Sequence, residues 1–287
     1  MNRWIVGARV RTLPAAVVPV ALGAAIAVGD GHAVWWRGGA ALLVSIALQV
    51  GVNFANDYSD GVRGTDDVRV GPVRLVGGGL ANARTVKLAA VSAFGVAAVG
   101  GLLLAASTSW WLLLVGAASI AAGWFYTGGS NPYGYMGLGE LFVFVFFGLV
   151  ATVGSTFVII EQIPASSWIA GCLSGCLACS LLVINNLRDI PTDKLAGKRT
   201  LAVRLGDRLT RYLYVALILA ALTLIGVLAV THSWAAIGLV GGLLFVVPVR
   251  SVLRGASGAN LIPVLGMTGR GQLVCGLLVA AGIAFSA

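Results

Sequence analysis

Nine long apolar runs constrain the fold of this chain more than any other feature. They lie near residues 13–29, 38–55, 88–106, 109–126, 137–160, 167–187, 211–230, 233–249 and 270–286. A helix needs roughly 20 apolar residues to cross a bilayer, and within lipid a helix satisfies its own backbone hydrogen bonds. The charged fraction is 10%, where soluble domains carry about 25%. The sequence therefore predicts an all-α integral membrane protein with nine transmembrane helices around a central cavity, and it excludes a soluble enzyme and a disordered chain.

The connections between these runs are too short to form a separate soluble domain. The longest polar ones are about 56–87 and 188–210, so residues 1–287 are predicted to form a single membrane domain. Three arginines precede the first run, as in a signal peptide. Because eight further runs follow, an uncleaved first helix is the better interpretation.

The basic residues indicate how the chain is oriented in the membrane. With nine spans, the N-terminus and every second connection share one side, and that side receives 18 of the 19 Lys and Arg residues; Arg37 alone lies opposite. Such an excess marks the cytoplasmic side. We therefore predict a multi-pass protein of the plasma or inner membrane with a cytoplasmic N-terminus. Eight of the ten acids lie on the same side, the exceptions being Asp30 and Glu161, and ordinary topology does not explain this.

Two acidic segments follow the second and sixth runs. The first reads Asn53-Phe-Ala-Asn56-Asp57-Tyr58-Ser59-Asp60 and continues to Asp66-Asp67, and the second reads Asn185-Asn186-Leu-Arg188-Asp189-Ile-Pro191-Thr192-Asp193. Both contain Asn-x-x-x-Asp, a spacing that stacks the two side chains on one helix face. The second copy comes four runs after the first. This suggests an internal duplication, about 13–126 and 137–249, with two aspartate-rich cytoplasmic connections facing each other across the cavity.

The composition of these segments points to a metal and a phosphate. Carboxylates crowded at helix C-termini meet the negative end of the helix dipole and repel each other unless a cation is present. Oxygen ligands without His or Cys favour Mg²⁺ or Ca²⁺, and Mg²⁺ usually shares its shell with substrate phosphates. The neighbouring basic residues suit a diphosphate. The alternative is that the acids only form salt bridges with Arg63, Arg188 and Lys194.

Both segments resemble the aspartate-rich motifs of UbiA-type intramembrane prenyltransferases. Further stretches resemble the branch that prenylates 1,4-dihydroxy-2-naphthoate in menaquinone synthesis: residues 9–14, 60–66, 126–135, 197–201 and 261–265. The similarity runs from the first helix into the last. Two departures are present. The first motif is stretched, so its third acid is Asp66 or Asp67, and Asn131 stands where some relatives have a basic residue.

The resemblance implies a Mg²⁺-dependent transfer of a polyprenyl group from polyprenyl diphosphate to 1,4-dihydroxy-2-naphthoate, with loss of CO₂ and diphosphate, giving demethylmenaquinol. It implies two Mg²⁺ ions, held by the catalytic carboxylates Asp57, Asp60, Asp189 and Asp193 together with Asp66. Diphosphate contacts are expected from Asn53, Asn56, Arg63, Asn185, Arg188 and Lys198. The acceptor ring or an allylic cation is expected to meet Tyr126, Tyr133 and Tyr135. No protein partner and no nucleic acid is implied.

The apolar runs carry two further signals. Four phenylalanines would either line a groove for the prenyl tail or simply face lipid: Phe142, Phe144, Phe146 and Phe147. Pairs of glycines four residues apart predict close helix packing; they are Gly171/Gly175 and Gly238/Gly242.

Two other functions stay open from the sequence. One is prenylation of a different aromatic acceptor, such as 4-hydroxybenzoate. The other is secondary transport, since polar helix breaks in repeated halves are typical of transporters. The acids are predicted at the cytoplasmic ends of helices rather than at mid-membrane, which favours a surface-facing site for metal and diphosphate.

Overall fold

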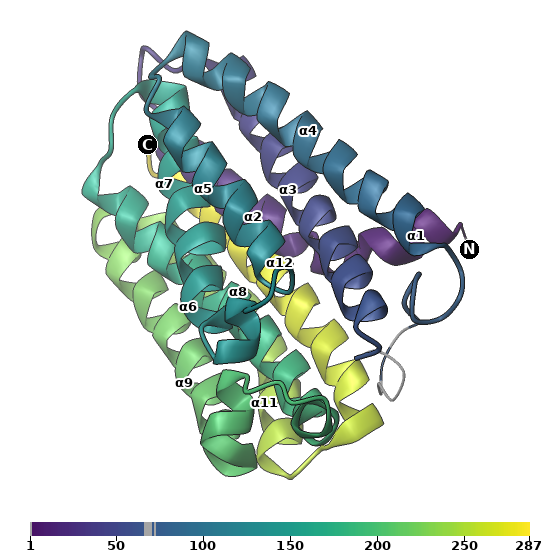
Figure 1. Ribbon diagram of the computed structural model, residues 1–287. Helices are drawn as coiled ribbons and strands as arrows, with labels where there is room; N and C mark the ends of the chain where they lie inside the picture. Colours follow the sequence, from purple (N-terminus) through teal and green to yellow (C-terminus); the bar gives the residue numbers. More distant parts are fainter. Residues whose placement is uncertain (1, 66–70, 72) are drawn as a thin grey trace.

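The computed structural model describes residues 2–65, 71 and 73–287, and in these ranges it contains helices and no β-strand (Figure 1). The α-helices are α1 (Arg3–Ala8), α2 (Pro14–Ile26), α3 (Trp35–Val62), α4 (Ala83–Ser107), α5 (Leu112–Phe125), α6 (Gly139–Val143), α7 (Ala151–Ile160), α8 (Ala165–Leu195), α9 (Leu201–Thr231), α10 (Gly238–Gly242), α11 (Val246–Leu253) and α12 (Leu261–Phe285). Short 3₁₀ segments are η1 (Val10–Thr12), η2 (Tyr133–Met136), η4 (Ser233–Ile237), η5 (Leu243–Phe245) and η6 (Gly258–Asn260), and η3 (Phe144–Val150) is π-helical.

Seven helical segments of the described chain are long and apolar enough to cross a membrane: Trp35–Val62, Ala83–Ser107, Gly139–Ile160, Ala165–Leu195, Leu201–Thr231, Ser233–Leu253 and Gly258–Phe285. The pair Arg3–Thr12 and Pro14–Ile26, bent by 50°, makes an eighth if it counts as one span. Helix α5 has 14 residues and reaches about 21 Å, short of the roughly 30 Å hydrocarbon core. The all-helical membrane architecture is thus confirmed, whereas the prediction of nine transmembrane helices is not.

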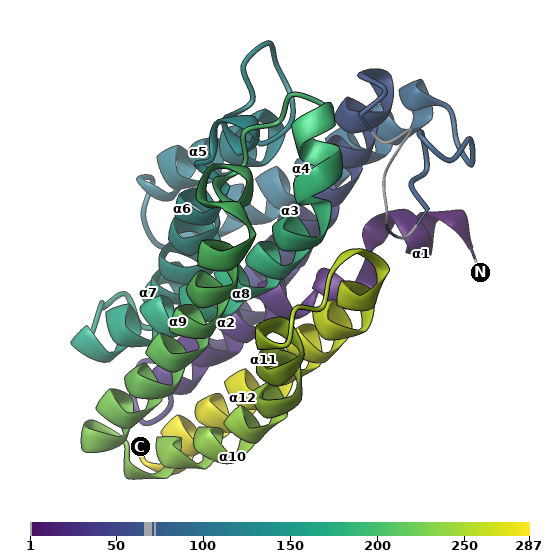
Figure 2. The same cartoon turned by 90° about the horizontal axis from the view of Figure 1, so that it is seen from below.

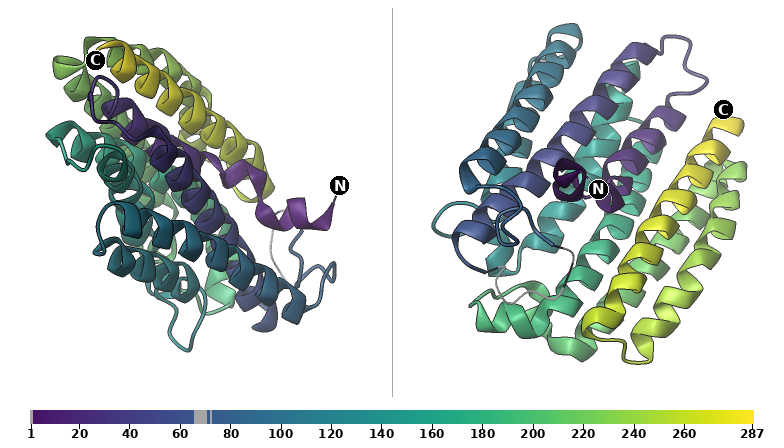
Figure 3. Two further views of the ribbon diagram at one scale, coloured as in Figure 1. Left: turned by 90° about the horizontal axis from the view of Figure 1, so that it is seen from above. Right: turned by 90° about the vertical axis from the view of Figure 1, so that its right-hand side faces the viewer.

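The bundle contains two long helical hairpins, α3–α4 and α8–α9, and a third pair formed by α2 and α12. Helix α3 packs along α4, α8 packs along α9, and α12 packs along α2 (Figure 3). Helix α8 lies at the centre (Figure 2). In the most apolar 18-residue stretch of α8, 78% of the residues are buried, against 28% in the corresponding stretch of α9. The helices around it leave large apolar side chains exposed, such as Val99 and Val230, as expected for surfaces that face lipid.

Local sequence signals explain where several helices begin and bend. Asn82 caps α4 by accepting a hydrogen bond from the Thr85 backbone N–H at 2.8 Å, and Thr200 caps α9 in the same way. Pro14 occupies the first turn of α2, where its missing N–H costs nothing. Gly206 has a φ of +76° inside α9, a left-handed conformation that glycine tolerates and that kinks the helix.

Glycines bring the central helices into close contact. A Cβ on Gly148 of η3 would meet the backbone of Gly171 and Gly175 on α8, and a Cβ on Gly242 would meet Leu222. A Cβ on Gly238 would likewise meet Val279. The close packing predicted at both glycine pairs is confirmed.

The four described aspartates of the two motifs lie on helices rather than in connections. Helix α3 continues to Val62 and α8 to Leu195, about two turns beyond the predicted ends of their apolar runs. Asp57 and Asp60 therefore belong to α3, and the predicted aspartate-rich connections are corrected accordingly; Asp189 and Asp193 likewise belong to α8. Asp66 and Asp67 lie outside the described residues. We call the end of the bundle that carries these four aspartates the polar end.

Candidate active site

One large cavity reaches from the polar end into the bundle, with a volume of about 920 Å³. Both acidic motifs contribute to its wall, although they are more than 120 residues apart in the sequence. Polar residues on the wall include Asn53, Asn56, Asp57, Asp60, Asn185, Asn186, Arg188, Asp189, Asp193 and Lys198, and the three tyrosines Tyr126, Tyr133 and Tyr135. Of the described site residues proposed from the sequence, all but Arg63 line this one space.

Asp57 is held by backbone groups. Its two carboxylate oxygens accept hydrogen bonds from the N–H groups of Leu75 and Val76, at 2.9 and 3.0 Å. The side chain is 1% exposed, and Leu75 is fully buried. Each carboxylate oxygen has two lone pairs and can accept from more than one partner. Asp57 therefore fixes the segment after the first motif as well as lining the cavity.

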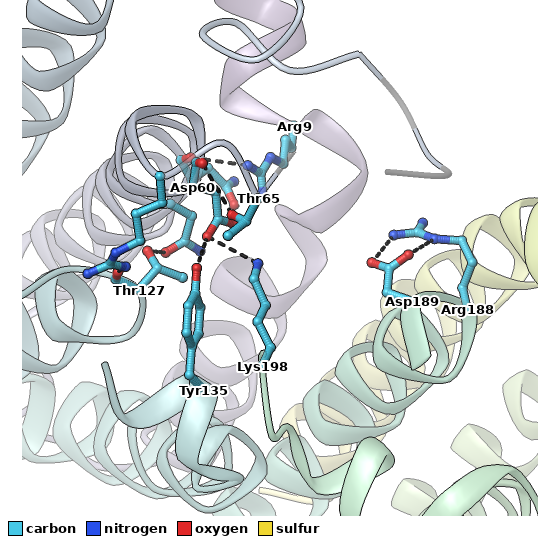
Figure 4. A network of polar contacts seen from close by, with 11 residues as sticks. Arg9, Asp60, Thr65, Thr127, Tyr135, Arg188, Asp189 and Lys198 are labelled. Atoms are coloured by element: carbon cyan, nitrogen blue, oxygen red, sulfur yellow. Dashed lines mark hydrogen bonds and ion pairs between the residues drawn. The ribbon is translucent and has the colours of Figure 1, made fainter. Parts of the chain in front are cut away.

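Asp60 joins three parts of the chain (Figure 4). Its Oδ1 accepts a hydrogen bond from the Tyr135 hydroxyl at 2.6 Å, and it forms an ion pair with Lys198 Nζ at 3.2 Å. The Lys198 ammonium also lies 4.7 Å from the centre of the Tyr135 ring, a cation–π geometry. Because Tyr135 precedes α6 and Lys198 follows α8, this cluster ties both halves of the molecule to the end of α3.

The same cluster shifts the protonation of its members. Burial and the negative charge of Asp60 raise the pKa of Tyr135, which therefore stays a hydrogen-bond donor. Burial by itself would lower the pKa of Lys198, but the negative charges of Asp60 and Asp193 outweigh it and the pKa is raised. Lys198 is thus a positive charge fixed at the polar end of the cavity.

In the second motif, Asp189 pairs with the residue that precedes it in the sequence, Arg188. Arg188 donates from Nε and Nη2 to the two oxygens of Asp189, at 2.7 and 2.6 Å, and Nη2 also donates to Asn185 Oδ1 at 2.9 Å (Figure 4). Arg188 is 3% exposed and Asp189 is 7% exposed. This bidentate pair places one cation and one anion side by side on the cavity wall.

Three predicted diphosphate ligands make other contacts. The Asn53 amide donates to Ala8 O at 2.9 Å and to Thr12 Oγ1 at 3.0 Å, which ties α3 to the bent N-terminal pair. Asn56 Oδ1 accepts from the Thr127 hydroxyl at 2.8 Å. Arg63 is exposed and donates to the carbonyl oxygens of Thr127 and Gly129, so it holds the loop before η2 instead of facing the cavity.

Several wall residues were not singled out from the sequence. Arg9 and Arg11 line the cavity at the break between α1 and α2, and Arg9 adopts a left-handed φ of 51° while donating to Asn53 O. Asn186 also lines it. The stretch 9–14 and the double asparagine were visible in the sequence, but only the packing shows that these side chains reach the same space.

An aromatic ladder leads from the polar end into the apolar part of the cavity. The rings of Tyr126 and Tyr133 meet edge to face at 5.5 Å, Tyr133 stacks on Phe142 at 4.0 Å, and Phe142 stacks on Phe146 at 6.0 Å. Of the four phenylalanines of the fifth run, Phe142, Phe146 and Phe147 line the cavity. The fourth, Phe144, instead packs against Gly175 of α8.

The donor set of the polar end fits Mg²⁺ held together with a substrate. In the described ranges, no three His, Cys, Asp or Glu side chains form a cluster that could hold a metal by themselves. Mg²⁺ is commonly bound by one or two carboxylates plus the phosphates of its substrate, with all ligands being oxygen. Asp60, Asp189 and Asp193 supply such carboxylates around one cavity, with Lys198 and Arg188 beside them for anionic phosphate oxygens.

Comparisons with known proteins agree with this geometry. The sequence pattern of the UbiA prenyltransferase family matches residues 16–268. The chain is 50% identical to a 1,4-dihydroxy-2-naphthoate octaprenyltransferase of Mycobacterium tuberculosis, over 99% of this chain and 97% of that protein. It is 34% identical to the 1,4-dihydroxy-2-naphthoate octaprenyltransferase of Escherichia coli, over 99% and 95%.

Solved structures share the fold. A UbiA homolog from Archaeoglobus fulgidus, bound to GPP and Mg²⁺, superimposes with a TM-score of 0.70 at 15% identity, covering 99% of this chain and all of that one. A UbiA homolog from Aeropyrum pernix gives a TM-score of 0.71 at 16% identity over 95% of each chain.

Proposed function

The chain belongs to the UbiA prenyltransferase family, and we propose that it transfers a polyprenyl group from polyprenyl diphosphate to 1,4-dihydroxy-2-naphthoate in menaquinone synthesis. CO₂ and diphosphate are lost, and the product is demethylmenaquinol. The observation that carries this function is the full-length identity with naphthoate octaprenyltransferases. The chain is accordingly an aromatic prenyltransferase.

The shape of the cavity supports this assignment. A polyprenyl diphosphate has a highly charged head and a long apolar tail, and the cavity has a polar end continuous with an apolar part. Lys198 and Arg188 lie where the head would bind, and Phe142, Phe146 and Phe147 where the first isoprenoid units would lie. One substrate therefore accounts for both parts of the cavity.

The reaction needs charge stabilisation more than an enzyme nucleophile. The allylic C–O bond breaks and its electrons leave with the diphosphate; the ring carbon that bears the carboxylate then bonds to the prenyl carbon. Loss of CO₂ returns its bonding electrons to the ring and restores aromaticity. Fixed charges at the polar end stabilise the departing diphosphate, and the faces of Tyr126 and Tyr133 stabilise the allylic cation or position the acceptor. The Tyr135 ring, which already has Lys198 over it, would act through its hydroxyl group.

Mg²⁺, when bound, supplies positive charge that favours departure of the diphosphate. Two ions would be held by the two motifs, one by Asp57 and Asp60 and one by Asp189 and Asp193. Asp66 or Asp67 would complete the first set. Asn56 and Asn185 would donate to phosphate oxygens, together with Arg188 and Lys198.

The polar end would face the cytoplasm of a bacterial cell, with the bundle in the plasma membrane. The basic residues support this orientation, because Arg9, Arg188 and Lys198 line the cavity beside the aspartates and Lys and Arg are enriched on the cytoplasmic side (Figure 4). The two hairpins α3–α4 and α8–α9 each carry an acidic motif at the end of their first helix, which supports an origin by duplication of four helices within one domain.

A direct assay tests the function. Purified protein in detergent, supplied with Mg²⁺ and a polyprenyl diphosphate, is offered either 1,4-dihydroxy-2-naphthoate or 4-hydroxybenzoate. We expect a prenylated, decarboxylated naphthalene product, and no product when Mg²⁺ is removed by EDTA. If neither acceptor is prenylated, the enzyme assignment is wrong; if only 4-hydroxybenzoate reacts, the acceptor assignment is wrong.

A further inference from the structure

A buried acid outside both motifs lies behind the cavity wall. Glu140, in the first turn of α6, is 8% exposed, whereas Glu161 and Asp207 pair with arginines and keep more than half of their side chains exposed. Burying a carboxyl group in a membrane protein is costly, and such residues usually serve a site. The reaction described above gives Glu140 no role.

The contacts of Glu140 show what it holds. Its Oε1 accepts a hydrogen bond from the Asn186 side-chain amide at 2.9 Å, and its backbone carbonyl lies 3.1 Å from Cys179 Sγ. Its Oε2 is buried and has no hydrogen-bond partner within the described parts of the chain. None of the ion pairs found in those parts includes Glu140. The carboxyl group is therefore directed to one cavity residue, Asn186.

This contact decides which end of Asn186 is available to a ligand. A side-chain amide has two N–H donors and one oxygen acceptor, and the nitrogen must face the Glu140 oxygen. Asn186 lies on the cavity wall, so its amide oxygen is the acceptor it presents there. Its neighbour Asn185 differs, because its oxygen already accepts from Arg188.

The chemistry of an acceptor oxygen selects between the two substrates. Diphosphate oxygens accept hydrogen bonds, so an amide oxygen gains nothing from them. The hydroxyl groups of a dihydroxylated ring donate. An aromatic ring lies close by. The Tyr126 ring packs against Gly139, the residue before Glu140: its Cε2 lies 3.2 Å from where a Cβ atom at Gly139 would be. A flat aromatic acceptor would find both a ring face and a hydrogen-bond acceptor here.

We propose that Glu140 is a positioning residue, which orients Asn186 so that its side-chain oxygen accepts a hydrogen bond from a hydroxyl group of the aromatic acceptor. The proposal rests on the proposed function, since it concerns the second substrate of that reaction. Asn186 touches the acceptor, and Glu140 acts through Asn186.

Steady-state kinetics at saturating polyprenyl diphosphate test it. Glu140→Leu and Asn186→Leu should each raise the KM for 1,4-dihydroxy-2-naphthoate about five- to tenfold, the value of one hydrogen bond, without changing the KM for the donor or the Mg²⁺ dependence. Glu140→Gln should stay within about twofold of wild type, because its amide oxygen still accepts from Asn186. Cys179→Ala, which removes the other contact of Glu140, is the matched control and should leave the kinetics unchanged.

Substrate analogues make the test independent of folding. Two naphthoate analogues, one lacking the 1-hydroxyl group and one lacking the 4-hydroxyl group, are compared with the full substrate by calorimetry. One of them should bind the wild type about five- to tenfold more weakly than the full substrate, and its affinity should not change in Asn186→Leu. A raised donor KM, a changed Mg²⁺ requirement, a Glu140→Gln variant as damaged as Glu140→Leu, or equal binding of both analogues by the wild type would each overturn the proposal. Absence of wild-type activity on the naphthoate would instead contradict the proposed function.

Discussion

The ends of α3 and α8 carry similar motifs and hold their carboxylates in different ways. At the end of α3, Asp57 accepts from backbone N–H groups of Leu75 and Val76, and Asp60 is joined to Tyr135 and Lys198, which lie 75 and 138 residues further along the chain. At the end of α8, Asp189 is joined to the adjacent Arg188. The first end is therefore fixed by segments distant in sequence, whereas Asp189 at the second end shares a bidentate ion pair with its neighbour on α8.

The largest effect should come from removing one carboxylate at each end. Asp57→Ala and Asp189→Ala should each lower kcat/KM at least about 100-fold, because each removes charge that would hold Mg²⁺ and the diphosphate. Turnover in detergent measures the loss, and the size-exclusion profile checks that the variants remain folded. Wild-type rates in either variant would refute the two-metal site and the equivalence of the two ends.

The local ion pair can be tested by removing its cation. Arg188→Gln should raise the KM for polyprenyl diphosphate more than about tenfold, since a charge-assisted contact of roughly 1.5–3 kcal/mol is lost. It should also strengthen Mn²⁺ binding in the absence of the prenyl donor, measured by electron paramagnetic resonance, because the positive charge that pairs with Asp189 is removed. Exposed Arg250 provides the control: Arg250→Gln should alter neither value. Unchanged Mn²⁺ affinity in Arg188→Gln would show that the pair does not compete with metal.

The fixed end can be tested at the hydrogen bond between Tyr135 and Asp60. Tyr135→Phe removes the hydroxyl that donates to Asp60 at 2.6 Å but keeps the ring beneath Lys198. We expect kcat/KM to fall about fivefold, because Asp60 keeps its ion pair. A loss as large as that of Asp57→Ala would mean that Tyr135 takes a direct part in the reaction.

The smallest effect concerns pH. The pKa of Lys198 is raised in the folded protein, so its ion pair contributes fully below the ordinary lysine value of about 10.4 and is lost as the pH rises through the raised value. The net contribution should be about 1 kcal/mol, because the cost of burying both side chains offsets much of their attraction. The melting temperature of the wild type should therefore fall more steeply above about pH 10 than that of Lys198→Met. Exposed Lys194→Met serves as the control, and it should follow the wild type.

Much of the fold was predictable because lipid imposes strict conditions. Each predicted apolar run overlaps a helix, and the glycine pairs do mark close packing. The count of spans was less certain, because hydropathy shows neither the bend before Pro14 nor the shortness of α5. Nor could it show that α3 and α8 continue as helices through their polar motifs, where side-chain contacts with other segments stabilise the last turns.

The residues of the candidate site were also predictable only in part. Residue type and spacing predicted Asp57, Asp60, Asp189 and Asp193 on one cavity, and all four lie on its wall. Arg63 was expected there too, but it holds a neighbouring loop. Spacing along a helix fixes which side chains share a face, but not what lies opposite that face.

By itself, the sequence determined that the chain belongs in a membrane, which end of the bundle carries the charge, and which carboxylates recur. These are properties of composition and of helical periodicity, and they need no knowledge of packing. Only the tertiary structure decided that Lys198 reaches Asp60 and that Glu140 turns Asn186 toward the cavity. Such pairings depend on where separate helices meet, and a buried polar group is stable only when that meeting supplies a partner.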